Sequence, residues 1–397
     1  MPPLPTDPIP LEQQLELPTY DKLPMALARG RGAYVWDTQG HRYLDFYGGH
    51  CVSLLGHCPP AVVEAVQSQA ETLLFYSNVA HSPVRAQAAR RLTTLAPEGL
   101  GTVFFANSGS EANETALKLA RTYTGRSGIA ALEGGWHGRT LGSLAATHDE
   151  TDRAPYAEVL PDTTWLPVGD LATAERVLST KEYAAVLLEP IQSIAGMREV
   201  PPRYVQGLRT LCDRYGTLLA FDEVQTGVGR TGTFSMSTPL GATPDLLSLA
   251  KSLGGGVPVS AVLVDDSVAE TVETGDQGST FGGGMLAMAA VEATLRTLVD
   301  DDLMSRAKQI QARIAARVGP LVEEVRGRGC LIGLRCDRPV APVVEALRSH
   351  DVLAGTSSDP HVLRLMPPLI VSDAHVDTFA DALRAALPVA VETLVRG

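Results

Sequence analysis

The chain has 397 residues, of which 45% are hydrophobic, and a formal net charge of −12 at pH 7. This length and composition allow a large buried core, and the acidic balance without a basic run argues against nucleic acid or an anionic membrane as a partner. The sequence has no long apolar run typical of a membrane-spanning helix, no signal-peptide pattern at its start and no zinc-like spacing among its five cysteines. We therefore expect a cytoplasmic protein without a metal site.

The N-terminal part predicts an extended segment, a hairpin and two helices. Residues 1–20 are rich in proline and are expected to be extended. Two short runs at 33–37 and 41–46, separated by a turn containing Gly40, predict a hairpin. Apolar periodicity then predicts helices at 61–72 and 83–95.

The central part, from residue 102 to 264, alternates short apolar runs with helical stretches. Seven runs are expected to be strands: 103–105, 128–132, 164–166, 184–188, 218–221, 246–249 and 260–264. Continuously apolar strands that alternate with helices predict an α/β fold with a mostly parallel seven-stranded sheet covered on both faces.

The C-terminal part has a different pattern, which predicts a smaller α+β domain. Its expected elements are helices at 287–298 and 305–317, a strand at 330–334, a helix at 341–349, a strand at 362–366 and a final helix. We therefore divide the chain into an N-terminal segment at 1–55, a large domain at 56–289 and a small domain at 290–397, with the N-terminal segment packed on the small domain.

Residues 227–232 (GVGRTG) match the glycine pattern of a dinucleotide-binding loop. That loop must follow a strand directly and open a helix. Here the strand is plausible, but the residues that follow are poor in helix formers and end at Pro239. We favour an irregular active-site loop, and attention moves to Asp222 just before it.

Four stretches carry residues that could take part in binding or catalysis, and each also has a structural explanation. Residues 106–114 (ANSGSEANE) join a strand to a helix, which suits a phosphate site or a simple helix cap. Trp136 stands among glycines and could stack on a planar ring or fill the core. The neighbouring Arg139 could bind a carboxylate or stay solvated.

The other two stretches end apolar strands. Asp222 could meet a bound cation or form a structural ion pair. Lys251 precedes three glycines and could form a Schiff base, or it could reach the surface. Taken together, the four stretches match what pyridoxal 5'-phosphate (PLP) needs: a phosphate site, a stacking aromatic, a carboxylate for the ring nitrogen and a lysine for the aldehyde.

At this point the sequence resembles the class III (ω-amino acid) aminotransferases of PLP fold type I. The motifs that carry the resemblance are NSGSEANETALK at 107–118, GWHGRT at 135–140, EPIQ at 189–192, FDEVQTGVGRTG at 221–232, AKSLGGG at 250–256 and STFGG at 279–283. They follow the family's order over about residues 30–383. Within the family, YLDF at 43–46, EVRGRG at 324–329 and LRLMPPL at 363–369 make the chain most similar to acetylornithine and other N-acyl-ornithine aminotransferases.

The resemblance implies that Lys251 binds the cofactor covalently and moves the proton, and that Asp222 pairs with the pyridinium nitrogen. Val224 and Trp136 would pack against opposite faces of the ring, and Gln225 would approach the ring hydroxyl. Gly109 and Ser110 would hold the phosphate, and Ser108, His137 and Glu189 are also implied to bind the cofactor.

The family pattern also implies the substrate residues and the oligomer. Arg139, Arg364 and Tyr47 would bind the substrate. Thr280 would reach the phosphate in the neighbouring subunit, which makes the protein a homodimer.

The implied reaction transfers the ω-amino group of an N-acyl-ornithine, acetyl or succinyl, to 2-oxoglutarate, giving the semialdehyde and glutamate in arginine biosynthesis. Acyl-lysine, GABA and ornithine remain alternative substrates, and a family aminomutase or a non-catalytic PLP-fold protein remain alternative functions.

Two departures from the family pattern stand out. Ser193-Ile194-Ala195-Gly196 replaces Gly-Glu-x-Gly, so an acidic gate residue is missing, and Gly284-Met285 replaces Asn-Pro. With Ile194 in the gate position, Arg364 is expected to stay open to carboxylates.

Overall fold

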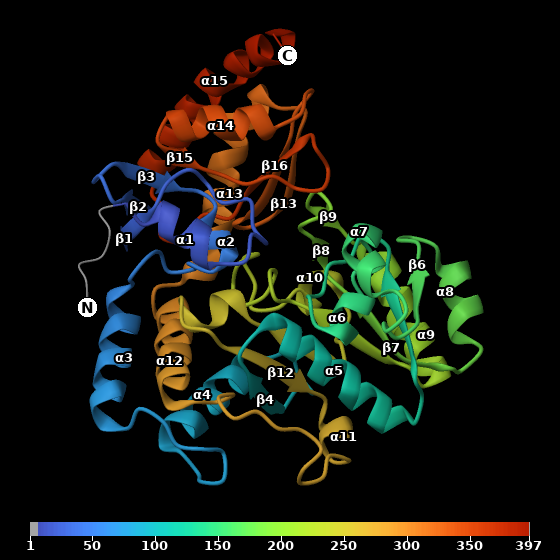
Figure 1. Cartoon of the computed structure of the whole chain (residues 1–397). Helices are drawn as coiled ribbons and strands as arrows, with labels where there is room; N and C mark the ends of the chain where they lie inside the picture. Colours follow the sequence, from blue (N-terminus) through green and yellow to red (C-terminus); the bar gives the residue numbers. More distant parts are fainter. Residues whose placement is uncertain (1–6, 397) are drawn as a thin grey trace.

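The computed structural model describes residues 7–396, and its larger part is built on a seven-stranded sheet (Figure 1). The strand order is β4-β12-β11-β10-β7-β5-β6. Only β12 runs antiparallel to its neighbours, so the sheet is mostly parallel as expected. The strands are β4 (Thr102–Ala106), β5 (Gly128–Leu132), β6 (Thr163–Leu166), β7 (Tyr183–Leu188), β10 (Leu218–Asp222), β11 (Leu246–Leu249) and β12 (Ser260–Val264).

Both faces of this sheet are buried, which explains why its strands are continuously apolar. Alternate residues of one strand point to opposite faces. Accordingly, Val186 of β7 belongs to one hydrophobic core and Leu187 to the other. One face is covered by α5 (Gly109–Thr124), and α9 (Pro202–Tyr215) packs on the other with α8 (Leu171–Leu178).

The smaller part combines the C-terminal elements with the N-terminal hairpin. Strands β13 (Glu324–Arg328), β14 (Leu331–Arg335) and β16 (Val362–Leu365) form an antiparallel sheet. A second sheet has the order β1-β2-β3-β15 and joins β1 (Leu27–Arg31), β2 (Tyr34–Asp37) and β3 (Arg42–Asp45) to β15 (Val352–Leu353). The N-terminal strands therefore pair with a strand from the far end of the chain (Figure 1).

Helices complete both parts. α3 (Pro60–Thr72) and α4 (Pro83–Leu95) pack against α12 (Met285–Asp300), a single helix that runs through residues 289 and 290. α13 (Leu303–Val318), α14 (Ala341–Ser349) and α15 (Asp373–Arg396) belong to the smaller part. The division of the chain after residues 55 and 289 stays a proposal. The proposed boundary after residue 289 falls inside α12, so this helix has residues on both sides of it.

The expectation of an extended N-terminus is wrong for part of the segment, because Ile9–Leu15 form the helix α1. Its prolines stand at the start of the helix, where a missing N–H costs nothing. Residues 1–6 of that expectation lie outside the described residues. Several short elements were also not anticipated: α2 (Gly48–Cys51), α6 (Leu141–Ala145), α7 (Glu150–Arg153), α10 (Ser237–Leu240), α11 (Asp266–Ala269), β8 (Ile191–Gln192) and β9 (Arg198–Glu199).

Within residues 7–396, no helix combines the length and the apolar character needed to cross a membrane. In the same part of the chain, no group of three or more His, Cys, Asp or Glu side chains is placed to hold a metal ion.

Candidate active site

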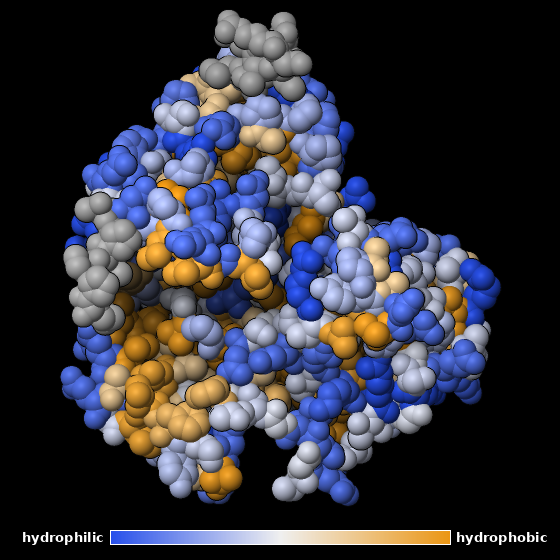
Figure 2. Space-filling view, viewed as in Figure 1, coloured by the Kyte–Doolittle hydropathy of each residue, from blue (hydrophilic) through white to orange (hydrophobic). Residues whose placement is uncertain are grey.

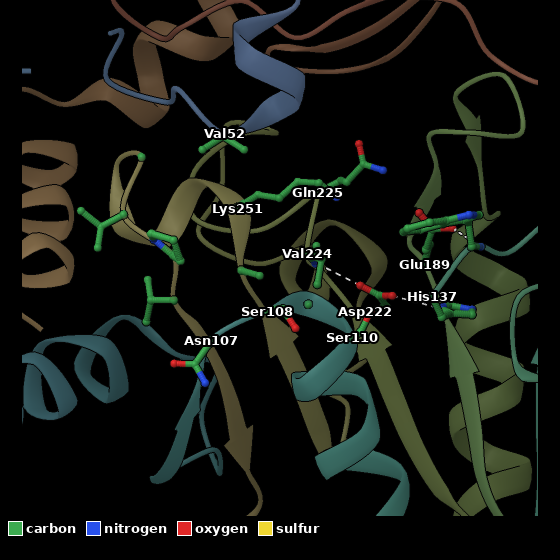
Figure 3. Close-up of a pocket in the computed structure, with 17 residues that line it drawn as sticks. Val52, Asn107, Ser108, Ser110, His137, Glu189, Asp222, Val224, Gln225 and Lys251 are labelled. Atoms are coloured by element: carbon green, nitrogen blue, oxygen red, sulfur yellow. Dashed lines mark hydrogen bonds and ion pairs between the residues drawn. The ribbon is translucent and has the colours of Figure 1, made fainter. Parts of the chain in front are cut away.

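A cavity of about 400 Å³ lies at the carboxyl ends of the parallel strands (Figure 3). The ends of β4, β5, β7, β10 and β11 contribute to its wall. All four stretches singled out in the sequence meet there, as expected for an open α/β sheet. The residues with functional potential in the lining are Asn107, Ser108, Gly109, Ser110, Trp136, His137, Glu189, Asp222, Val224, Gln225 and Lys251.

Asp222 ends β10 and is buried, with 4% of its surface exposed. Its Oδ2 accepts hydrogen bonds from Asn113 Nδ2 at 2.7 Å and from His137 Nδ1 at 2.8 Å. Its Oδ1 accepts from the backbone N–H of Val224 at 3.1 Å, as Figure 3 shows. These three donors fix the orientation of the carboxylate. The site therefore presents a held carboxylate to whatever occupies the cavity.

Asn113 was not singled out in the sequence, although it lies inside the motif at 107–118. It is fully buried on α5 and also donates to the backbone carbonyl of His137 at 2.8 Å. An amide on the apolar face of a helix is unusual unless it has partners. The place of Asn113 on the apolar face of the predicted helix was the signal that could have identified it from the sequence.

The start of α5 lines one end of the cavity. Ser108 caps the helix, and Glu111 completes a capping box by bonding back to the cap residue. The cap leaves the next N–H groups, of Gly109 and Ser110, outside the intrahelical ladder, so the helix cap does not exclude a phosphate site here. A Cβ at Gly109 would lie 3.0 Å from the side chain of Val224, so a larger residue here would require Val224 to move.

Lys251 follows β11 and begins a short 3₁₀ turn with a positive φ of 39°. A non-glycine residue in this region is strained, and such strain gathers at functional sites. Burial lowers the pKa of the Lys251 amine, and the cation of Arg364 acts in the same direction, against Cys51, Asp222 and Glu189. A lowered pKa increases the share of neutral, nucleophilic amine.

Glu189 lies behind Trp136. Its Oε1 accepts from the backbone N–H of Trp136 at 2.8 Å, which holds the aromatic residue at the cavity wall. Burial, followed by the nearby charge of Asp222, raises the pKa of Glu189 to about 8. The side chain is then mainly protonated at neutral pH, and a second negative charge beside Asp222 is avoided.

Arg364 and Tyr47 lie together but not in the lining of this cavity. Arg364 is 5% exposed, and its Nη2 donates to Tyr47 Oη at 3.0 Å and its Nη1 to Ser193 Oγ at 3.2 Å. No carboxylate of the described residues forms an ion pair with Arg364, which agrees with the missing acid at Ile194. The backbone carbonyl of Ile194 instead accepts from the N–H and hydroxyl of Ser358.

Arg139 and Thr280 also lie outside the cavity lining. The Arg139 side chain is largely exposed and forms an ion pair with Asp152 at 2.7 Å, while its backbone N–H donates to Ser110 Oγ. Thr280 lines a separate cavity with Asn78. The roles expected for both residues stay predictions.

The glycine pattern at 227–232 does not form a dinucleotide loop. It makes buried turns and leads only to the four-residue α10. Arg230 in this loop is fully buried, and its Nη1 donates to the carbonyls of Pro367, Met366 and Cys330. The loop therefore joins the two parts of the molecule.

Comparison with known proteins agrees with this geometry. The model of the family described as aminotransferase class-III matches residues 17–387. An acetylornithine aminotransferase of Methanopyrus kandleri is 46% identical over 376 residues, covering 93% of this chain and 96% of the relative. One of Mycobacterium tuberculosis is 42% identical over 384 residues, covering 96% of each.

Solved structures give the same result. An ornithine aminotransferase of Toxoplasma gondii has a TM-score of 0.91 at 29% identity, covering 97% of this chain and 94% of that one. An acetylornithine aminotransferase of Elizabethkingia anophelis has a TM-score of 0.84 at 30% identity, covering 96% of this chain and 98% of that one. A PLP-bound amine transaminase of an uncultivated Pseudomonas species has a TM-score of 0.86 at 29% identity, covering 94% and 98%.

The cavity fits PLP, the cofactor that these comparisons indicate. The N-terminus of α5 suits its phosphate, Asp222 suits its ring nitrogen and Lys251 suits its aldehyde. The buried Oε1 of Gln225 has no hydrogen-bond partner, and a ring hydroxyl would supply one. When bound, PLP supplies an electron sink for chemistry at the carbon next to the amine. The fold, the cavity and the comparisons together make this chain a member of the class III aminotransferase family.

Proposed function

We propose that the protein is a cytoplasmic homodimer that transfers the ω-amino group of an N-acyl-ornithine to 2-oxoglutarate, in arginine biosynthesis. The observation that carries the proposal is the meeting of Asp222 and Lys251 in one cavity at the strand ends. The relatives named acetylornithine aminotransferase support the choice of donor.

The residues divide the work as follows. Lys251 holds the cofactor and moves the proton, while Asp222 keeps the ring nitrogen protonated. Gly109 and Ser110 bind the phosphate. Trp136 and Val224 pack against opposite faces of the ring, and Gln225 approaches its hydroxyl. Arg139 takes a carboxylate of the donor, and Arg364 with Tyr47 takes a carboxylate of the acceptor.

A second cavity offers space for the acyl end of the donor. Its volume is about 370 Å³, and it shares Trp136 with the cofactor cavity and is also lined by Ile194 and Arg153. The Nε of Arg153 is buried without a partner, and its guanidinium stacks 5.0 Å from the ring centre of Trp165. Asp149 and Glu150 line the same cavity.

Arg153 forms no ion pair among residues 7–396, so a terminal carboxylate on the acyl group would give it one. We therefore expect N-succinylornithine to exceed N-acetylornithine in kcat/KM with 2-oxoglutarate. A charge-assisted hydrogen bond contributes roughly 1.5–3 kcal/mol, or about ten- to a hundredfold in specificity. The measurement is a panel of amino donors that includes ornithine, GABA and the acyl-lysines.

The matched variant for this prediction is Arg153→Gln, which keeps a polar side chain but removes the charge. It should lower kcat/KM for N-succinylornithine and leave kcat/KM for N-acetylornithine nearly unchanged. A clear preference of the wild-type enzyme for the acetyl donor would reject the acidic acyl site but not the aminotransferase. Turnover without any oxo acid would point to an aminomutase.

An apolar face supports the proposed dimer. Large hydrophobic side chains are exposed on α3 and on the segment after it, including Leu74, Tyr76 and Val79, where Figure 2 shows apolar residues gathered. Phe281 is 65% exposed and packs against Phe75. Because Thr280 adjoins Phe281, a second copy seated on this face would bring Thr280 close to the partner's cofactor.

We expect Val79→Arg to shift the protein from dimer to monomer and to weaken PLP binding at the same time, because one phosphate contact would come from the partner. Sedimentation velocity and PLP titration measure the two effects. Val159→Arg is the matched control, since Val159 is similarly exposed but lies away from this face. A monomeric variant that binds PLP as tightly as the wild type would contradict the contribution of the partner.

A further inference from the structure

The residues Gly48–Cys51 form one turn of left-handed helix between β3 and α3. Their φ angles are 59°, 54°, 64° and 70° for Gly48, Gly49, His50 and Cys51. Glycine adopts this conformation readily, but a residue with a Cβ atom does so at a cost. Two consecutive non-glycine residues in the left-handed region indicate that the surrounding structure forces them there.

Contacts at both ends hold this left-handed turn in place. The buried carboxylate of Asp45 accepts from three consecutive backbone N–H groups, those of residues 47–49, and from His57 Nε2 at 2.8 Å. At the other end, Ser252 Oγ donates to the carbonyl of Cys51 at 3.1 Å. The turn is thereby fixed between β3 and the residue next to Lys251.

The turn places His50 beside Tyr47, whose hydroxyl also contacts Arg364. Tyr47 Oη lies 2.6 Å from His50 Nδ1 and 3.0 Å from Arg364 Nη2. A guanidinium can only donate, so the tyrosine oxygen accepts from Arg364. We assign the hydroxyl proton of Tyr47 to His50 Nδ1, with the ring proton of His50 on Nε2.

The charges around His50 favour this neutral form. The groups that face it are Tyr47, Lys251 and Arg364. Partial burial of its ring, followed by the charges of Lys251 and Arg364, lowers the pKa of His50 to about 4. The ring is therefore neutral across the neutral pH range, and a neutral imidazole has one nitrogen that can accept from Tyr47.

Arg364 is left with a free pair of donors. Its Nε donates to the carbonyl of Thr356, one N–H of Nη1 to Ser193 and one N–H of Nη2 to Tyr47. A guanidinium has five N–H groups, so one remains on each terminal nitrogen. Two such donors can hold a carboxylate in bidentate fashion, provided that the neutral partners keep the guanidinium plane fixed.

We propose that His50 is a positioning residue which, through Tyr47, sets the affinity of Arg364 for the carboxylate of the amino acceptor. This inference rests on the proposed transfer to 2-oxoglutarate. His50 orients the tyrosine hydroxyl, the hydroxyl oxygen orients one terminal nitrogen of Arg364, and the substrate carboxylate meets an arginine that is already in place.

The test uses His50→Gly and His50→Asn in the holoenzyme. Glycine removes the ring and tolerates the left-handed backbone, whereas asparagine also tolerates it and offers an amide oxygen near the position of Nδ1. We expect His50→Gly to raise KM for glutamate about three- to tenfold, the loss of one neutral hydrogen bond. The half-reaction with N-acetylornithine should change less than about twofold, because Arg139 is proposed to take the donor carboxylate. His50→Asn should behave nearly like the wild type.

A Tyr47→Phe background separates this role from a merely structural one. If His50 acts through the tyrosine hydroxyl, His50→Gly adds nothing to KM for glutamate once that hydroxyl is gone. The inference would be overturned if the effects of His50→Gly and Tyr47→Phe on KM for glutamate multiplied in the double variant. It would also be overturned by an unchanged KM for glutamate in His50→Gly, or by an equal increase of that KM in His50→Gly and His50→Asn.

If the proposed function is wrong, the same measurements give a result that can be told apart from these. A wild-type holoenzyme inert to glutamate would reject the proposed acceptor. The same variants are then compared by the dissociation constant of glutarate, an unreactive dicarboxylate, followed by the absorbance of the cofactor. Equal constants in the wild type and His50→Gly would overturn the role of His50.

Discussion

Replacing Asp222 with alanine is expected to lower kcat on the order of hundreds-fold or more while the protein keeps bound PLP. The proposed phosphate site at Ser108–Ser110 and the proposed packing of Trp136 and Val224 against the ring remain in this variant, so we expect it to hold the cofactor. The carboxylate serves the ring nitrogen, where charge matters most in the transition state. Removal of a buried ionic partner costs ~3–5 kcal/mol, which corresponds to a loss of this size. Stopped-flow absorbance of the donor half-reaction measures it.

Asp222→Asn is the matched control, because it keeps the shape of the side chain and loses only the charge. It should be impaired nearly as much as the alanine variant, while Asn113→Ala, which removes one of the three donors to Asp222, should lose much less. Near-normal turnover in Asp222→Ala with PLP bound would show that the carboxylate does not carry the chemistry.

Replacing Lys251 with alanine is expected to abolish turnover, because no other lysine among residues 7–396 lines the cavity. In the wild type, borohydride reduction should fix PLP on the peptide that contains Lys251, and the variant should take up no such label. Burial lowers the pKa of this amine, so more of it is neutral and reactive at a given pH than of an exposed lysine. Mass spectrometry of the reduced, digested protein identifies the labelled residue.

Lys22→Ala is a suitable control, since Lys22 forms only exposed ion pairs with Glu12 and Glu16. It should retain both the label on Lys251 and full turnover. Label on Lys118 or Lys181 in the reduced wild-type protein would contradict the assignment.

The sequence allowed the strands of the large sheet to be predicted because each is a continuous apolar run between polar turns. It could not reveal that β12 runs antiparallel, since a strand buried on both faces has the same apolar pattern in either direction. The helix α1 was missed because prolines at a helix start resemble those of an extended segment.

The residues of the candidate site could also be predicted from the sequence only in part. Asp222 and Lys251 were predictable, because the ends of parallel strands share one edge of the sheet. The partners of Arg364 were not, since Tyr47 and Ser193 are far from it in sequence and meet it only in the folded chain. His50 gave no signal of its own, because its position depends on a left-handed turn that two adjacent glycines only suggest.

The continuity of α12 across residues 289 and 290 affects how the protein can be divided. A fragment that ended at residue 289 would keep little more than one turn of a helix that runs from 285 to 300, and so short a helix is unstable alone. It would also leave α3 and α4 without most of the surface that they bury against α12. Fragments intended to fold separately are better cut after Asp300, so that the large part retains the whole helix and the small part begins at α13.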